Sequence, residues 1–329
     1  MPEQYYYSDP VPTKLYIVRD KMGAKYTIDV AKENQRDIDA VVDRRMRSIQ
    51  EYRSFSENLR EHVTTLLRER SKGMFMWLSL VLDDLSTWEG IWTETRVKEK
   101  LQSTPRDVEA FYGAMLEEQS RDVVSRLRTL LMWVFFTCRP LTLREVDMIL
   151  ILQEGKNCTG VTSSDEDLEA LRCSIENSWG TLFVVRDGAL HLCHGSVRDF
   201  LSYLFSDEGE KEYPRYGINK IAAHRQMAAV CLTYLCLDEI QKREVPKPPV
   251  NSDGLIDESK LTAVKQRYLD RYALLQYAVE FVGHHLRESQ IQEETDVIGM
   301  KDFFSADSAA LFSWVKSYDL LKRWTYGKC

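Results

Sequence analysis

The sequence predicts a mainly α-helical fold that contains one small β-hairpin. Apolar residues recur at helical spacing along most of the chain, as they do between Asn34 and Ile49. Only residues 181–186 and 189–193 have the short apolar pattern of strands, and Asp187–Gly188 between them favours a two-residue hairpin turn. Hydrophobic residues make up 44% of the 329 residues and charged residues 29%, which is typical of a globular protein with a sizeable core.

The first third of the chain predicts an extended segment followed by a helical domain. Residues 1–26 are rich in Tyr and interrupted by Pro, so we expect them to be extended. Residues 27–118 predict helices, with Asn34 capping the first and Asp107 marking the start of the last. The segment 73–85 is apolar nearly all round but too short to cross a bilayer. We therefore expect neighbouring helices to bury it on several sides.

The next segment, 119–206, predicts the element order of a winged-helix domain. A helix through 123–134 ends before Thr142, which is placed to cap the following helix. A third helix is expected at 165–178, followed by the hairpin and by a helix at 196–205. Three helices followed by a hairpin is the order on which this prediction rests.

The remaining residues, 207–329, predict a C-terminal helical domain. A charged stretch at 206–216 is expected to form a break between helices. The three prolines within 245–254 predict an exposed loop. Helices are expected at 218–235, 261–288 and 303–321.

The charge distribution argues against a nucleic-acid partner. The net charge is −7, and a nucleic-acid-binding face needs cations to neutralise phosphates. In winged-helix DNA binders the third helix enters the major groove. Here that helix carries a single arginine, Arg172, among five carboxylates. A DNA-binding winged helix is therefore the least favoured alternative. The carboxylates are Asp165, Glu166, Asp167, Glu169 and Glu176.

Cysteine usage and hydropathy predict a cytoplasmic protein. The seven cysteines are scattered without any CxxC spacing, which is typical of free thiols in a reducing compartment. We expect neither disulfides nor a metal site. The first 20 residues contain no apolar run like that of a signal peptide. No apolar stretch approaches the roughly 20 residues that cross a bilayer, so we expect no membrane segment.

Motifs of self-contained catalysis are absent from the sequence. The phosphate-binding loop GxxxxGK(S/T) does not occur, because Gly155–Lys156 and Gly327–Lys328 lack the earlier glycine and the preceding strand. The patterns GxSxG, HExxH and GxGxxG do not occur either. We therefore expect no catalytic residue and no enzyme activity in this chain by itself.

One histidine stands at a position that suits an anion. His194 follows the second predicted strand and precedes the helix expected at 196–205. A lone histidine beside apolar residues is usually packed in the core, whereas a helix N-terminus favours phosphate. The residues alone leave both interpretations open.

Four segments, taken in order, carry a resemblance to a known family. They are GMFMWLSLVLDDL (73–85), RPLTLRE (139–145), LHLCHGSVRDFL (190–201) and YALLQYAVEFVGHHL (272–286). Together they resemble the fungal NACHT family of STAND-type ATPases, which includes heterokaryon-incompatibility proteins. The first is similar to the family's helix after the ATPase core, the next two to its winged helix, and the last to the helix before its repeats. The winged-helix segment also resembles that of fungal proteins similar to GPI inositol deacylase.

The resemblance implies the regulatory part of a signalling ATPase, which holds ADP in the inactive state and relays activation. It implies that His194 contacts the β-phosphate of ADP and that Pro140 lies near the base. ADP or ATP would be bound only if the chain were joined to an upstream NACHT ATPase core, whose end would be residues 1–26. A downstream repeat domain would be a further partner. The alternative is a nucleotide-independent protein-interaction scaffold from a truncated paralogue.

Overall fold

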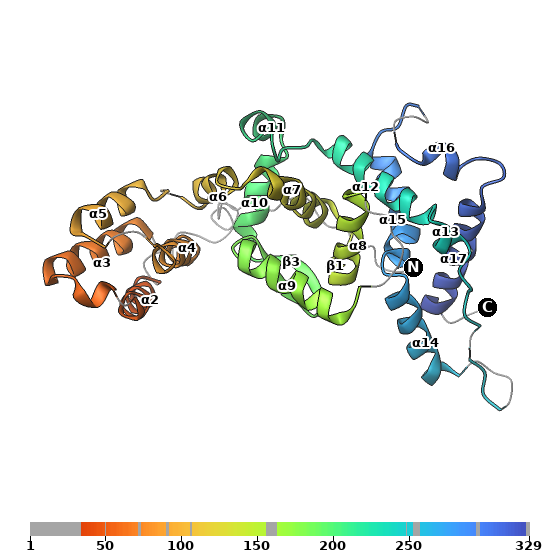
Figure 1. Ribbon diagram of the computed structural model, residues 1–329, viewed down its shortest axis with the longest axis horizontal. Helices are drawn as coiled ribbons and strands as arrows, with labels where there is room; N and C mark the ends of the chain where they lie inside the picture. Colours follow the sequence, from red (N-terminus) through yellow and green to blue (C-terminus); the bar gives the residue numbers. More distant parts are fainter. Residues whose placement is uncertain are drawn as a thin grey trace, which may run out of the picture. The chain divides into compact units, whose positions relative to one another are not determined.

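The chain divides into two compact units, Met1–Glu118 and Gln119–Cys329, and each has a buried core of its own. Both are built mainly from helices, which confirms the predicted fold class. The segment predicted to be extended at 1–26 lies outside the described residues. The computed structural model describes residues 34–49, 51–71, 74–89, 92–105, 107–155, 163–247, 249–252, 257–293 and 297–326 (Figure 1).

The described helical elements of the first unit surround an apolar helix, α4. They are α2 (Gln35–Ser48), the 3-10 helix η2 (Glu51–Ser54), α3 (Glu57–Ser71), α4 (Phe75–Ser86), α5 (Glu94–Ser103) and α6 (Val108–Glu117). Helix α4 contacts α2, α3 and α6, and six of its side chains are buried. One of these is Trp77, whose indole N–H donates to the carbonyl of Pro105 at 2.8 Å. The structure thus confirms that neighbours bury this segment on several sides.

The sequence predicts two helix starts in this unit. The start at Asp107 is confirmed, and the prediction that Asn34 caps its helix is wrong. Asp107 is the N-cap of α6, and its carboxylate accepts from the N–H of Ala110 at 2.7 Å. Asn34 precedes α2, but its side chain makes no capping hydrogen bond. The backbone of Asn34 is already helical, at φ −76° and ψ −9°, whereas a capping side chain reaches the first turn from an extended residue.

The second unit begins with helices around a small sheet. The elements are α7 (Arg121–Phe136), β1 (Leu141–Thr142), α8 (Leu143–Gln153), α9 (Asp165–Trp179), β2 (Phe183–Arg186), β3 (Ala189–Leu192) and α10 (Gly195–Leu204). The strands form an antiparallel sheet in the order β1-β3-β2, with Leu190 of β3 opposite both Leu141 and Val185. The helices and the hairpin follow the predicted order. Strand β1 is an addition, because its two residues have no strand pattern of their own.

The hairpin turn and the cap of α8 have the predicted chemistry. Asp187 and Gly188 have φ angles of 52° and 74°, as the turn of a two-residue hairpin requires. Thr142 caps α8 through a capping box. Its hydroxyl accepts from the N–H of Glu145, while the Glu145 carboxylate accepts from the N–H of Thr142 at 2.8 Å.

The rest of the second unit is helical, and α12 packs along α15 (Figure 1). The elements are α11 (Asp207–Glu212), α12 (Lys220–Leu235), α13 (Asp238–Gln241), α14 (Glu258–Arg271), α15 (Leu275–Glu288), α16 (Met300–Phe303) and α17 (Ala309–Tyr326). Helix α12 also contacts α7 and α8, so the segments predicted at 119–206 and 207–329 share one compact unit. Among the described helices, none combines the length and the apolar character needed to cross a bilayer.

The break predicted at 206–216 is wrong in its first half, where the short helix α11 forms. The Ser206 hydroxyl accepts from the N–H of Gly209 and so caps this helix. Three carboxylates, Asp207, Glu208 and Glu210, lie in the first turn, where the helix dipole favours negative charge. A charged stretch without apolar periodicity therefore forms a helix because its charges suit the N-terminal end.

Candidate functional site around the Arg139–Pro140 turn

The structure places His194 at the junction between β3 and α10, as its N-cap residue. The backbone N–H of Ser196 donates to Nδ1 of His194 at 3.1 Å, and the Ser196 hydroxyl lies 2.9 Å from the same nitrogen. The His194 side chain is exposed. The packed-core interpretation of His194 is therefore wrong, while its contact with a nucleotide stays a prediction.

The capping bond determines which nitrogen of His194 carries the proton. An imidazole nitrogen that accepts a hydrogen bond has no proton of its own, so in the neutral ring the proton is on Nε2. Nε2 then presents an N–H donor on the far side of the ring from the helix. Because the cap occupies Nδ1, Nε2 is the nitrogen from which the ring would donate to a phosphate oxygen.

Pro140 is exposed and lies between α7 and β1. Leu141 pairs with Leu190 of β3, the strand that ends two residues before His194. Pro140 thus directly precedes one strand of this pair, and His194 follows the other. Contact of either residue with a nucleotide stays a prediction.

Arg139, next to Pro140, is held by a buried carboxylate. Its guanidinium donates to both oxygens of Glu145, at 2.6 and 2.9 Å, and the Glu145 side chain is only 3% exposed. Burial by itself would lower the pKa of Arg139, but the hydrogen bond and the charge of Glu145 outweigh burial and raise it. The guanidinium also lies 5.3 Å from the ring centre of Tyr277, a cation–π contact. Glu145 and Tyr277 therefore both hold Arg139, the residue before Pro140.

A chain of hydrogen bonds runs from this turn into the pair formed by α12 and α15. The Thr137 hydroxyl donates to the carbonyl of Arg139 at 2.8 Å and lies 3.0 Å from the Tyr277 hydroxyl. The Tyr277 hydroxyl lies 2.9 Å from Nε2 of His285, whose Nδ1 lies 2.8 Å from Nδ1 of His224. These side chains connect the end of α7 with both helices of the pair.

The Tyr277 hydroxyl is the branch point of this chain, because the backbone N–H of Cys138 also donates to it, at 3.4 Å. The two nitrogens that face each other in His285 and His224 share one proton, since one of them must donate and the other accept.

Sequence reasoning did not single out Glu145, Tyr277, His224 or His285. Glu145 and Thr142 do form a capping-box pattern, which names Glu145 as a cap partner but says nothing of Arg139. Tyr277 and His285 are eight residues apart, which is close to two helical turns and places them on one face of a helix. That spacing was a usable signal, but His224 is 61 residues away in the chain and only packing reveals it.

The acidic helix α9 presents its charge to solvent. Four of its five carboxylates, Asp165, Glu166, Asp167 and Glu169, are exposed. One of them, Asp165, pairs with Arg144. An exposed acidic face repels a DNA duplex.

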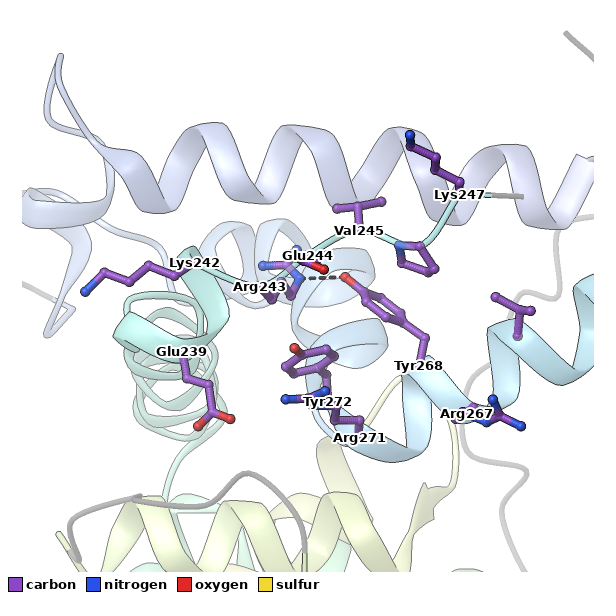
Figure 2. Close-up of a pocket in the computed structure, with 12 residues that line it drawn as sticks. Glu239, Lys242, Arg243, Glu244, Val245, Lys247, Arg267, Tyr268, Arg271 and Tyr272 are labelled. Atoms are coloured by element: carbon purple, nitrogen blue, oxygen red, sulfur yellow. Dashed lines mark hydrogen bonds between the residues drawn. The ribbon is translucent and has the colours of Figure 1, made fainter. Parts of the chain in front are cut away.

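A separate pocket in this unit has a cationic lining (Figure 2). Its volume is about 760 Å³. Within it, Nε of Arg243 donates to the Tyr268 hydroxyl at 2.7 Å, and the remaining donors of Arg243 bond Ser313, Ser317 and the Ile240 carbonyl. Among the described residues no carboxylate pairs with this guanidinium. The pocket favours anionic groups. Its charged residues are Lys242, Arg243, Lys247, Arg267, Arg271, Glu239 and Glu244.

Comparison with known proteins gives weak similarity to two fungal proteins. No protein-family profile matches the chain, and no solved structure matches it. The chain is 26% identical over 242 residues to azaphilone pigments biosynthesis cluster protein L of Monascus ruber, covering 68% of this chain and 44% of that protein. It is 23% identical over 181 residues to vegetative incompatibility protein HET-E-1 of Podospora anserina, covering 53% of this chain and 12% of that protein. The chain is thus similar to a vegetative incompatibility protein and spans less than half the length of either relative.

Proposed function

We propose that this chain is the regulatory part of a NACHT-type signalling ATPase and helps to hold ADP in the inactive state. The observation that carries the proposal is the exposed N–H donor of His194 at a strand-to-helix junction. The order of helices and strands around it agrees with a winged-helix interpretation of residues 119–206. Similarity to a vegetative incompatibility protein supports a role in signalling.

In this proposal the chain contributes contacts rather than catalysis. The Nε2–H of His194 donates to a phosphate oxygen of ADP, and Pro140 lies against the base. The sequence lacks a phosphate-binding loop, so ATP hydrolysis requires an upstream ATPase core that supplies it. A downstream repeat domain is the proposed sensor. Loss of the phosphate contact biases the protein toward a second state with different contacts, as a ligand-controlled switch requires.

The Arg139–Glu145 pair gives the switch a rigid element next to the nucleotide contact. Pro140 follows an arginine whose guanidinium is held by two hydrogen bonds to a buried carboxylate. Through Thr137 and Tyr277 the same turn is bonded to α15. A displacement at Pro140 therefore reaches the C-terminal helices through hydrogen bonds that must break or shift together.

The test separates the capping role of His194 from its phosphate role. The 5′ end of the native transcript is mapped first, and the protein is expressed together with the ATPase core that it encodes. In this protein we compare His194→Asn with His194→Ala and measure the ADP that co-purifies. Asparagine caps helices well but has no donor at the position of Nε2, so His194→Asn should keep the fold and release ADP at least about tenfold faster.

The control is His191→Asn, which changes a histidine of the neighbouring strand and should retain ADP. Equal ADP retention in His194→Asn and the unaltered protein would contradict the phosphate contact. Loss of ADP only in His194→Ala would mean that His194 acts as a helix cap alone. A transcript that begins at Met1 would leave the protein without a phosphate-binding loop and would favour the second candidate function.

A protein-interaction scaffold without nucleotide is the second candidate, and the surface of α17 favours it. Phe312 is 64% exposed, Val315 is 51% exposed and Tyr318 is 38% exposed, at a spacing of three residues. Such a row of apolar side chains on one helix is typical of a surface that another protein covers. Binding of a protein partner that is lost in Phe312→Ser and insensitive to ADP would support this function.

A further inference from the structure

Three histidines converge where α12 packs against α15. His224 comes from α12, and His284 and His285 come from α15. One ring nitrogen of each lies within 4.8 Å of those of the other two. His224 is 3% exposed and His285 is fully buried, whereas His284 is partly exposed. Two buried imidazoles and a third that is partly exposed thus bring three ring nitrogens together.

The hydrogen bonds around the cluster suit a metal-bound imidazole. The Tyr277 hydroxyl lies 2.9 Å from Nε2 of His285, and Nδ1 of His285 faces Nδ1 of His224 at 2.8 Å. Metal-bound histidines commonly donate their other ring N–H to such an acceptor, which fixes the ring. For two ligands of a tetrahedral zinc ion, the separation of the two nitrogens needs to widen by only about half an ångström.

The charged groups around the cluster come from α12 and α15. Burial lowers the pKa of His224 to about 4 and that of His285 to about 3, and it lowers the pKa of His284. The Glu288 carboxylate adds negative charge near His224 and His284, while Lys220 and Arg287 oppose it. Lys220 is held by Glu288 at 2.6 Å.

We propose that His224, His284 and His285 form a binding site for a divalent transition-metal ion of the zinc class. Imidazole ligands suit zinc, copper and nickel rather than magnesium or calcium, which prefer oxygen. Three protein ligands leave a fourth position on the solvent side, beside the partly exposed His284. The ion would link α12 to α15. This site is distinct from the nucleotide contact proposed for His194 and does not depend on it.

The experiment uses the full chain, purified without a histidine tag so that every metal-binding histidine belongs to the protein. The chain is dialysed against Zn²⁺ in the presence of a weak chelator, and zinc per chain is measured by mass spectrometry. Replacement by Co²⁺ reports the ligand geometry through its visible absorption. We compare His284→Ala, Tyr277→Phe and His191→Ala, the last being a histidine outside the cluster.

We expect one zinc ion per chain and the absorption of a tetrahedral Co²⁺ site. His284→Ala should weaken zinc binding at least about tenfold, because it removes a ligand. Tyr277→Phe should weaken it by roughly 10- to 100-fold, because it removes the hydroxyl that orients His285. His191→Ala should bind like the unaltered chain. Far-UV circular dichroism checks that each variant keeps its helices.

Two results would overturn the proposal. In the first, the unaltered chain retains no stoichiometric zinc and gives no tetrahedral Co²⁺ spectrum. In the second, His284→Ala and His191→Ala bind zinc equally, which would assign the metal to scattered surface histidines. Since neither measurement involves nucleotide, the outcome is independent of the ADP experiment on His194.

Discussion

Glu145 serves two neighbouring groups with a single buried carboxylate. One role is local, because its oxygen accepts from the N–H of Thr142 and completes the cap of α8. The other role is ionic, because both oxygens accept from Arg139. A buried carboxylate is tolerated only when such partners replace its water. Residue-scale chemistry therefore fixes the backbone on both sides of Pro140.

Removing the charge of Glu145 tests this arrangement. Glu145→Gln keeps the size of the side chain but leaves the Arg139 guanidinium without its counter-ion. We expect the free energy of unfolding to fall by about 2 kcal/mol, since Arg139 is only 29% exposed and water replaces the lost bonds incompletely. Urea unfolding of the two proteins measures the difference.

The matched control is Asp238→Asn, which makes the same chemical change in the exposed pair between Asp238 and Lys242. Both side chains of that pair are more than three-quarters exposed, so we expect less than about 1 kcal/mol. Equal losses in Glu145→Gln and Asp238→Asn would show that burial adds nothing to the Arg139–Glu145 pair.

At the scale of elements, local signals determined the long helices and the hairpin. Helices such as α2 and α7 have apolar periodicity over several turns, and the turn at Asp187–Gly188 has residues that tolerate positive φ. The short elements β1 and α11 lack apolar periodicity, although α11 has a capping residue and an acidic first turn. Strand β1 exists only because β3 pairs with it, and α11 only because Ser206 caps it and its charges suit the helix dipole.

Two glycines test this account with opposite expected signs. Gly188 has φ +74°, so Gly188→Ala forces a side chain into the left-handed region although the space around it is open. We expect a loss of about 1 kcal/mol in the free energy of unfolding. Gly283 lies exposed within α15, and an added Cβ would meet nothing within 4 Å. Gly283→Ala should therefore stabilise the protein by up to about 1 kcal/mol.

Thermal unfolding of both variants, followed by circular dichroism, measures these changes. The two substitutions are chemically identical, so any difference in sign reports the backbone conformation alone. Stabilisation by Gly188→Ala would show that the hairpin turn does not have the left-handed conformation.

At the scale of the whole molecule, the chain consists of two compact units. The second unit contains the sheet, the Arg139–Pro140 turn and the histidine cluster. Many of its buried side chains come from α7, α8, α10, α12 and α15, which lie within the unit. A unit with its own core is expected to fold by itself.

This expectation is tested with a fragment that begins at Gln119 and ends at Cys329. We expect it to unfold cooperatively and to have the helix content of the corresponding part of the chain, as measured by circular dichroism during a urea titration. The control is a fragment cut inside α12, which removes half of the surface that packs on α15. If the Gln119 fragment unfolds no more cooperatively than that control, the division into units has no energetic meaning.

The sequence by itself determined the mainly α fold class, the cap at Thr142, the hairpin turn and the place of His194. Each depends on residues within about four positions of one another, since caps, turns and helical faces are local. The sequence also showed the absence of a phosphate-binding loop, because that motif is contiguous.

Only the tertiary structure decided the exposure of His194, the pairing of β1 and the histidine cluster. Exposure depends on which elements cover a residue, and a two-residue strand exists only through its partner. The cluster contradicts no local pattern, but His224 and His285 meet only because α12 packs along α15. Cysteine spacing predicted no metal site, whereas packing brings together three histidines from two helices. Long-range contacts of this kind leave no fixed spacing in the chain, so the sequence could not reveal them.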